Sequence, residues 1–165
     1  MPKSCVAVDP SINNCGIAIF IDDKLIMHDL LHPSKEIQML DQPTSEHYRA
    51  KARDICNQIR KIYQTVKEKD PKTILITEVP EHFGNSGYIS RETGSVFKLT
   101  FVCGMIFGIS EDCIAYQPSK WKGQLSKEVV RNRLVRDYPK RDIETLDNNI
   151  VDAIGIGHKY IKGSV

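Results

Sequence analysis

Three carboxylates in this sequence occupy positions where burial would be costly. Asp9 and Glu78 each end a short apolar run, and Asp152 lies within an apolar segment near the C-terminus. A carboxylate at the end of a buried strand is unfavourable unless it pairs with a cation or binds one. We therefore expect the three groups to meet in the fold and to hold divalent metal, because hard cations such as Mg²⁺ prefer oxygen ligands. Two such ions about 3.5–4 Å apart can drive phosphodiester hydrolysis.

The length and composition of the chain favour one globular domain over residues 1–165. A chain of this length buries about 70% of its unfolded surface, and a hydrophobic fraction of 41% excludes disordered and collagen-like classes. No apolar stretch reaches the length of a membrane span. The N-terminus leads directly into a strand-like run, so we expect no signal peptide.

The cysteines predict a reducing environment rather than a disulfide or zinc framework. Their number is odd, none forms a C-x-x-C pair, and most lie in apolar runs. We expect buried, reduced thiols. The five are Cys5, Cys15, Cys56, Cys103 and Cys113.

The net charge of +2 is unevenly distributed. Eight basic residues fall between Lys120 and Arg141 and only Glu128 and Asp137 oppose them, which gives +6 there and −4 elsewhere. One interpretation is an ordinary solvated helix face; the other is a surface for a polyanion. Trp121, the sole tryptophan, lies inside this stretch. The basic residues are Lys120, Lys122, Lys127, Arg131, Arg133, Arg136, Lys140 and Arg141.

The first half of the chain predicts a three-stranded meander and a long helix. Alternating apolar patterns indicate strands at 5–9, 15–21 and 24–29, with Asp22-Asp23 as a tight turn. Apolar residues between Tyr48 and Val66 recur at helical spacing and predict an amphipathic helix that ends before Pro71.

The second half alternates strands and helices. Its predicted elements are a strand at 73–77, a loop at 82–94, an apolar segment at 96–107, a strand at 113–116, a basic loop at 117–124, a helix from 126 to 138 and a helix from 147 to 161. This order predicts an α/β protein with a mixed sheet covered by helices. Asp9 and Glu78 then end the first and fourth strands, which are neighbours in the ribonuclease-H-like fold, a mixed five-stranded sheet flanked by helices.

Four motifs in this order resemble RuvC-type Holliday-junction resolvases. The segment from Asp9 to Gly16 is similar to their opening D-x-S-x-x-x-x-G, and Glu78 after a buried strand matches their second acid. Asp152-Ala153-Ile154 resembles their closing D-A-[LI] signature. The segment 118–123, with Lys127 after it, resembles their basic segment in the version of the short phage and large-DNA-virus enzymes.

The resemblance implies a metal-dependent endonuclease of DNA recombination and repair. Such an enzyme binds four-way junctions as a homodimer, cleaves them symmetrically and leaves 5′-phosphates; other branched DNA is a possible substrate. Asp9, Glu78 and Asp152 would hold two Mg²⁺ ions, for which Mn²⁺ would substitute. One ion would activate the attacking water and the other would stabilise the leaving oxygen. We expect a cytoplasmic or nucleoid-associated protein, in the host cytosol if a phage encodes it, with an organelle left open.

The resemblance also assigns the DNA contacts. Lys127 would stabilise charge at the scissile phosphate, and Lys120, Lys122 and Arg131 would hold flanking phosphates. Phe83 and, less strongly, Tyr88 would stack on unpaired bases. The alternative for Phe83 is a loop side chain packed on the sheet edge.

Asn149 departs from the family pattern, which places an acid or a histidine three residues before the last Asp. Residues at i and i+3 share a helix face, so Asn149 is a fourth candidate ligand, although its amide lacks a charge. The sequence leaves open whether Asn149 is natural or an engineered Asp→Asn change. A junction-binding module with impaired catalysis is therefore the main alternative. A ribonuclease for RNA–DNA hybrids is a further one; an actin-like ATPase lacks support, because the chain has no Gly-rich turn after Asp9 and is too short for a second domain.

Overall fold

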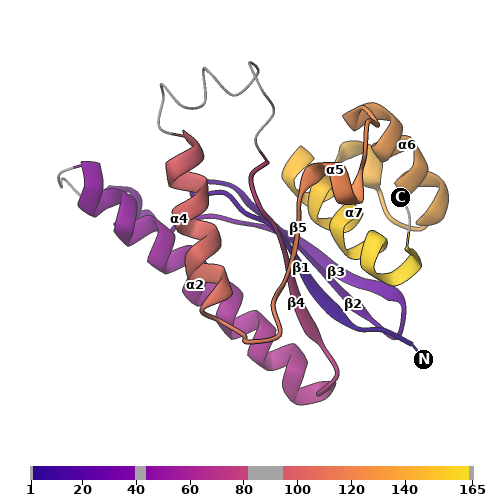
Figure 1. The fold of residues 1–165 in the computed structure, drawn as a ribbon, viewed down its shortest axis with the longest axis horizontal. Coiled ribbons are helices and arrows are strands. Elements are labelled where there is room, and N and C mark those ends of the chain that lie inside the picture. Colours follow the sequence, from indigo (N-terminus) through magenta and orange to yellow (C-terminus); the bar gives the residue numbers. More distant parts are fainter. Residues whose placement is uncertain (1, 40–43, 82–94, 164–165) are drawn as a thin grey trace.

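The computed structural model describes residues 2–39, 44–81 and 95–163, and it contains one mixed five-stranded sheet (Figure 1). The strand order is β3-β2-β1-β4-β5. Antiparallel pairing joins β1 to β2 and β2 to β3, whereas β4 runs parallel to β1 and to β5. This arrangement confirms the predicted mixed sheet of the ribonuclease-H-like fold. The strands are β1 Cys5–Asp9, β2 Cys15–Ile21, β3 Lys24–Leu31, β4 Ile74–Glu78 and β5 Ile114–Tyr116.

The predicted turn between β2 and β3 is a two-residue hairpin connection. Ile21 pairs with Lys24, and both intervening residues, Asp22 and Asp23, have positive φ angles of 49° and 64°. Such angles match the twist of the flanking strands, and aspartate tolerates them better than most residues. The hairpin therefore follows the expected course, and β3 continues two residues beyond the predicted end.

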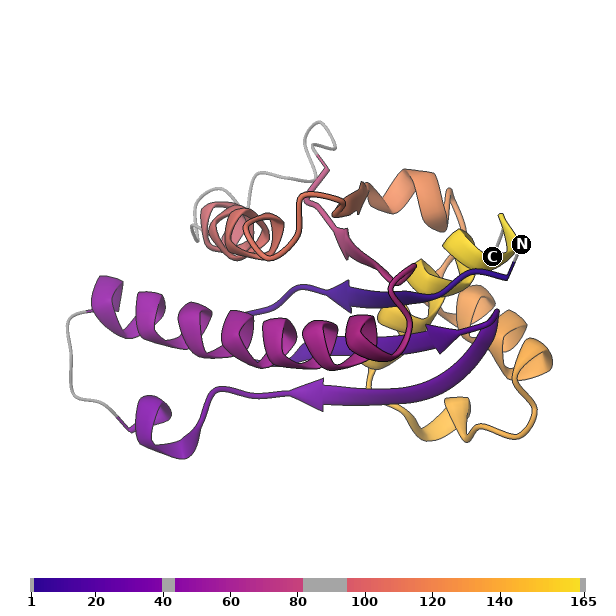
Figure 2. The same ribbon diagram turned by 90° about the horizontal axis from the view of Figure 1, so that it is seen from below.

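Helices cover both faces of the sheet (Figures 1 and 2). Successive residues of β1 point to opposite faces: Val6 and Val8 pack in one core and Cys5 and Ala7 in the other. The first core is covered by α2 (Thr44–Lys69) and α4 (Ser95–Phe107), with the short α1 (Lys35–Gln38) beside α2. The second is covered by α5 (Pro118–Trp121), α6 (Lys127–Asp137), η2 (Ile143–Thr145) and α7 (Asn148–Lys162).

The predicted helices are present, and side chains cap the N-termini of two of them. Ser126 accepts a hydrogen bond from the Val129 N–H at the start of α6, and Asp147 accepts one from the Asn149 N–H at the start of α7. The apolar stripe of α2, including Ala52, Ile55 and Ile59, is buried against the sheet as expected.

The segment 117–124, predicted as a loop, contains the one-turn helix α5. Pro118 is the first helical residue, where a missing N–H costs no hydrogen bond. The short elements α1 and η2 were also not predicted, because a single turn carries too little periodicity to be read. The five cysteines are free, in agreement with the expected thiols. Within the described ranges, no helix has the length and apolar character needed to span a bilayer.

Close contact between α7 and the sheet depends on glycines. A Cβ atom on Gly16 of β2 would lie 1.9 Å from the main-chain oxygen of Asn149, and one on Gly157 would lie 2.2 Å from the Phe20 ring. Real Cβ contacts do not reach these distances. The first turn of α7 therefore rests directly on β2 where Gly16 pairs with Asp9.

Candidate active site

The fold brings the three predicted carboxylates to one edge of the sheet. Asp9 and Glu78 are the last residues of the parallel neighbours β1 and β4, and the preceding pair, Val8 and Thr77, is in register. Asp152 lies on the second turn of α7, one turn beyond the contact with Gly16, and is 7% exposed. The strand ends and the packing of α7 thus place Asp152 beside the two strand carboxylates.

The electrostatics of these groups show that they act on one another. The pKa of Asp9 is raised well above its usual value, first by burial and then by the charges of Glu78 and Asp152, whereas Lys122 and Lys127 oppose the shift. Burial also raises the pKa of Glu78. Because the charges of Glu78 and Asp152 disfavour ionisation of Asp9, a cation bound among these carboxylates would be favourable.

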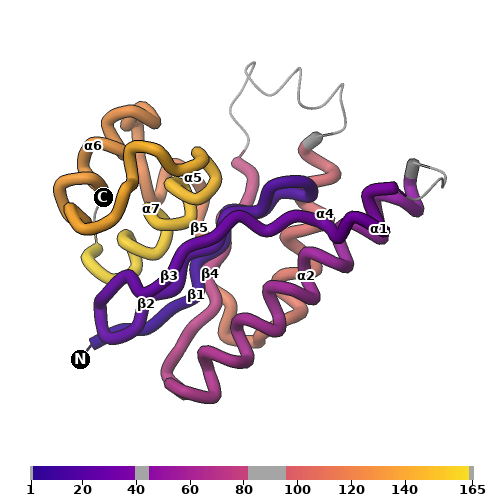
Figure 3. Tube along the Cα trace, turned by 180° about the vertical axis from the view of Figure 1, so that it is seen from behind, coloured from indigo at the N-terminus to yellow at the C-terminus, as the bar shows by residue number. Residues whose placement is uncertain are grey.

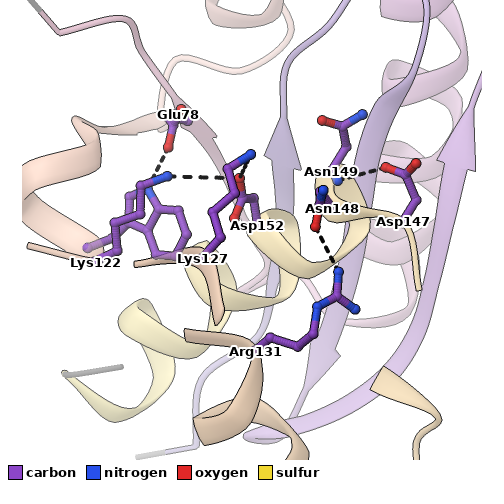
Figure 4. Close-up of polar contacts among 9 residues, drawn as sticks. Glu78, Lys122, Lys127, Arg131, Asp147, Asn148, Asn149 and Asp152 are labelled. Atoms are coloured by element: carbon purple, nitrogen blue, oxygen red, sulfur yellow. Dashed lines mark hydrogen bonds and ion pairs between the residues drawn. The ribbon is translucent and has the colours of Figure 1, made fainter. Parts of the chain in front are cut away.

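Two lysines supply positive charge at this site. Lys122, just after α5, and Lys127, the first residue of α6, place their Nζ atoms 3.9 and 3.8 Å from Oδ2 of Asp152 (Figure 4). The Lys122 side chain is 18% exposed, but that of Lys127 is 64% exposed. The Lys127 side chain is therefore open to solvent, and the phosphate contact expected of it stays a prediction.

Trp121 has a role at the site that the sequence did not reveal. Its indole Nε1–H donates a 2.6 Å hydrogen bond to Oε2 of Glu78, and Lys122 lies over its ring at 4.7 Å from the centroid. The ring packs on α7, where a Cβ on Gly155 would lie 2.4 Å from it. Trp121 is 3% exposed, so it is a fixed donor that orients Glu78.

A second contact ties α5 to the end of β4. The Ser119 hydroxyl and N–H donate to the two carboxylate oxygens of Glu81 at 2.7 and 3.0 Å. These hydrogen bonds lower the pKa of Glu81. Glu81 and Glu78 thus hold the short helix that carries Trp121 and delivers Lys122.

Arg131 requires a different interpretation from the predicted phosphate contact. Its Nη1 donates to the carbonyl oxygens of Ile143, Glu144 and Leu146 at 2.6–3.1 Å, and its Nη2 donates to Oδ1 of Asn148 at 2.8 Å (Figure 4). The guanidinium is therefore engaged in holding η2 and the start of α7. These hydrogen bonds favour a structural role for Arg131 over the predicted phosphate contact.

The structure describes two of the four remaining predicted residues, Lys120 and Asn149. Lys120 is exposed on α5. Asn149 lies one turn before Asp152, half-buried, and Figure 4 shows both on the first turns of α7. Phe83 and Tyr88 fall outside the described residues.

The donor set fits Mg²⁺ or Mn²⁺, because Asp9, Glu78, Asp152 and Asn149 offer only hard oxygen ligands. Within residues 2–39, 44–81 and 95–163, no group of three His, Cys, Asp or Glu side chains is already arranged to hold a metal ion. In this arrangement Trp121 and the two lysines are the partners of Glu78 and Asp152. A bound cation would add to the positive charge that the two lysines supply to these carboxylates.

Comparison with solved structures agrees with this architecture. The structure of Thermus thermophilus RuvC matches with a TM-score of 0.61 and 16% identity over 98% of this chain and 97% of that one. The T. thermophilus RuvC in complex with a Holliday junction substrate matches with a TM-score of 0.62 and 15% identity, covering 94% and 90%. The chain has the RuvC fold. The yeast mitochondrial Holliday junction resolvase matches as well, with a TM-score of 0.55 and 11% identity over 97% and 78%. No protein-family model and no curated protein sequence matches the chain.

Proposed function

We propose that residues 1–165 form a RuvC-like nuclease domain that binds four-way DNA junctions and cleaves them symmetrically in the presence of Mg²⁺. The observation that carries the proposal is the position of the carboxylates. Asp9, Glu78 and Asp152 lie at one edge of a RuvC-type sheet, with Lys122 and Lys127 beside them. The solved RuvC with a Holliday junction substrate has this fold, which supports branched DNA as the substrate class.

Each residue of the site has a separate role in the proposed reaction. Asp9, Glu78 and Asp152, with Asn149 as a fourth donor, would hold Mg²⁺ or Mn²⁺, which when bound supplies an activated water and charge stabilisation at the scissile phosphate. Lys127, an exposed cation whose Nζ lies 3.8 Å from Asp152, would neutralise charge on the reacting phosphate. Trp121 keeps Glu78 oriented. Lys122 and the exposed Lys120 would fix the adjoining backbone phosphates.

A homodimer is part of the proposal. The outer face of α4 carries Phe97, Phe101 and Gly104, and Gly108 follows directly after the helix. Their spacings of four, three and four residues place them in one stripe. Phe97 is 74% exposed and Phe101 is 44% exposed, and a Cβ on Gly104 would meet no atom within 4 Å. An exposed aromatic stripe with small residues is suited to close packing against a second copy.

One assay tests the reaction and the substrate. An end-labelled four-way junction, an RNA–DNA hybrid and a linear duplex are each incubated with Mg²⁺ and with chelator. We expect paired cuts only in the junction and only with Mg²⁺. Asp9→Asn should abolish cleavage and retain junction binding, since it removes a metal ligand and leaves the lysines in place. Near-normal cutting by Asp9→Asn would refute the assigned site, and hybrid cutting would favour a ribonuclease.

A junction-binding module without efficient catalysis is the second candidate. The observation that favours it is Asn149, a neutral residue one turn before Asp152 where the family pattern has an acid or a histidine. Tight, junction-selective binding with no cutting in Mg²⁺ or Mn²⁺ would support this candidate over the enzyme.

A further inference from the structure

A basic pocket lies next to Asp9. It is on the face of the sheet that α2 and α4 cover, opposite Lys122 and Lys127. It has a volume of about 520 Å³ and is formed by three separate parts of the chain: the β1–β2 connection, the first turns of α2 and the first turns of α4. Its cations are Lys51 and Lys98, and its other polar groups include Ser11, Asn13 and His47. Among the described residues that line it there is no aspartate or glutamate.

The lysines of this pocket are available to an anion. The Lys51 Nζ donates to Oδ1 of Asn13 at 3.3 Å, and the Lys98 Nζ lies over the Tyr48 ring at 5.7 Å. In the described part of the chain neither lysine forms an ion pair with a carboxylate. Two ammonium groups without acidic partners in one pocket repel each other, and an anion between them relieves that repulsion.

Two polar atoms of residues that line the pocket also lack partners. Nε2 of His47 and the hydroxyl of Tyr48 are buried and have no hydrogen-bond partner in the structure as described. Buried polar groups are usually satisfied, and an unsatisfied one calls for a ligand or water. A phosphate has several acceptor oxygens for such groups.

The place of the pocket identifies the source of the anion. Pro10, which lines it, directly follows Asp9, so the two Cα atoms are about 3.8 Å apart. Figure 3 shows the β1–β2 connection beside the N-terminal end of α4. A DNA strand that presents a phosphodiester to Asp9 carries further phosphates on both sides. Phosphates on one flank would meet Lys120 and Lys122, and a phosphate on the other flank would lie within reach of Lys51 and Lys98.

We infer that the pocket between the β1–β2 connection, α2 and α4 binds a backbone phosphate of the DNA strand that enters the carboxylate site. The inference rests on the proposed function, because it takes DNA as the substrate. It adds a contact on the α2–α4 side of the sheet, where the basic stretch 120–141 does not lie. Lys51 and Lys98 act together on one phosphate and fix the direction of the strand across Asp9.

The test measures DNA binding without cleavage. Binding of a fixed-centre four-way junction is followed by fluorescence anisotropy in chelator from 50 to 300 mM salt, for the wild type, Lys51→Gln, Lys98→Ala and the double variant. Lys61→Ala is the matched control, because Lys61 is exposed on α2 about 15 Å further along the helix. We expect the double variant to bind more weakly and to lower the slope of log K against log[salt] by about 0.9, the value for one phosphate. The control should leave both unchanged.

A methylphosphonate scan locates the phosphate. Single neutral linkages are placed at successive positions on either side of the cleavage point of one strand. In the wild type, one neutral linkage on the side of the cleavage point away from Lys120 and Lys122 should reduce the slope of log K against log[salt]. In the double variant the same linkage should have no further effect on that slope, because the two changes remove one contact. Thermal melting of each variant establishes that it is folded. If Lys51→Gln unfolds, Lys98→Ala is used alone, because among the described residues the Lys98 side chain contacts the Tyr48 ring and its loss removes no side-chain hydrogen bond.

The outcomes separate this inference from the proposed function. Pocket variants that match Lys61→Ala, while the wild type binds junctions selectively, overturn the inference and leave the function intact. A wild type that binds junction and linear duplex equally contradicts the proposed function, and the slopes on the duplex then still decide the pocket. Competition by inorganic phosphate that depends on Lys98, with no change in the DNA slope, would show a free-anion site and overturn the inference.

Discussion

At the scale of single residues, the short hydrogen bond from Trp121 to Glu78 is the contact with the clearest consequence. Trp121→Phe keeps the aromatic packing on Gly155 and removes the donor. Groups that orient metal ligands are typically worth about 10- to 100-fold in metal affinity or activity. We predict that the half-saturating Mg²⁺ concentration for single-turnover junction cleavage rises by about tenfold or more. An unchanged Mg²⁺ titration in a folded variant would show that Glu78 needs no such support.

Asn149 gives a second prediction at this scale. Asn149→Asp adds a carboxylate on the helix face of Asp152, where attraction to divalent cations outweighs repulsion between acids. We predict that cleavage rises by about tenfold or more, the gain being smaller if Asn149 is the natural residue. Single-turnover cutting across a Mg²⁺ titration measures it, with Asn148→Asp as the neighbouring control. Equal rates for both variants and the wild type would place Asn149 away from the metals.

The residues that the sequence indicated are those with a local signal. An acid directly after a buried strand is visible in the sequence, so Asp9 and Glu78 were predicted and the structure brings them together. The hydrogen bond from Trp121 to Glu78 joins residues 43 positions apart in the sequence, and those from Arg131 join residues 12 to 17 positions apart. Such partners depend on how the helices pack across the sheet. A pattern of charged residues does not distinguish an arginine that binds phosphate from one that donates to main-chain carbonyl oxygens.

At the scale of elements, the contact between β2 and α7 determines where Asp152 lies. Gly16→Ala would place a methyl group 1.9 Å from the Asn149 carbonyl oxygen, which belongs to the main chain and cannot rotate away. Overpacking usually costs about 1–3 kcal/mol, and we predict a loss at or above that range, together with loss of cleavage. Urea unfolding measures the free energy. Lys61→Ala is the control, because Lys61 is exposed on α2 and its substitution should leave the free energy of unfolding nearly unchanged. Equal stability of the two variants would contradict the packing described.

The contact between the C-terminal end of α6 and α7 predicts a pH dependence of stability. His158 is buried, its Nδ1 lies 2.7 Å from the Tyr138 hydroxyl, and its Nε2 lies 3.5 Å from Asp137. Burial lowers the pKa of His158, Asp137 opposes this, and Lys162 reinforces it. The unfolded chain therefore binds the proton more readily, so the contribution to stability is complete above about pH 6.5 and is lost as the pH falls below it.

We therefore predict that the free energy of unfolding of the wild type decreases between pH 7.5 and 5.5 more than that of His158→Gln. Urea denaturation at several pH values gives both profiles. Parallel profiles for the two proteins would show that His158 does not contribute to the pH dependence.

Element boundaries were predicted well where periodicity is long. The stripe of α2 and the alternation of β1 and β2 reflect burial of one face, and the caps Ser126 and Asp147 mark helix starts by their own side chains. The helix α5 was missed because it is stabilised from outside, by the contact of Ser119 with Glu81. A one-turn helix has little intrinsic stability, so its presence depends on tertiary contacts that the local sequence does not encode.

At the scale of the whole molecule, the exposed stripe on α4 predicts the assembly. We expect a dimer mass by sedimentation at micromolar concentration, with and without junction DNA. Phe97→Glu should shift the mass to monomer and remove paired cutting, because a charge would be buried at the interface. Ile26→Glu, on the sheet-edge strand β3, is the control at another exposed apolar residue. A dimer that survives Phe97→Glu would mean that the two copies meet elsewhere, and a monomer in all conditions would refute the homodimer.

The position of α7 across β1 and β2 has a consequence for biosynthesis. Asp9 belongs to β1 and Asp152 to α7, which are separated by most of residues 1–165, so a growing chain has only part of its candidate catalytic set until α7 has left the ribosome. Closing so long a loop is also entropically costly and comes late in folding. If the proposed function holds, chains that stop before α7 would thus be unable to cut DNA, and the cell would meet the proposed nuclease activity only in molecules that include α7.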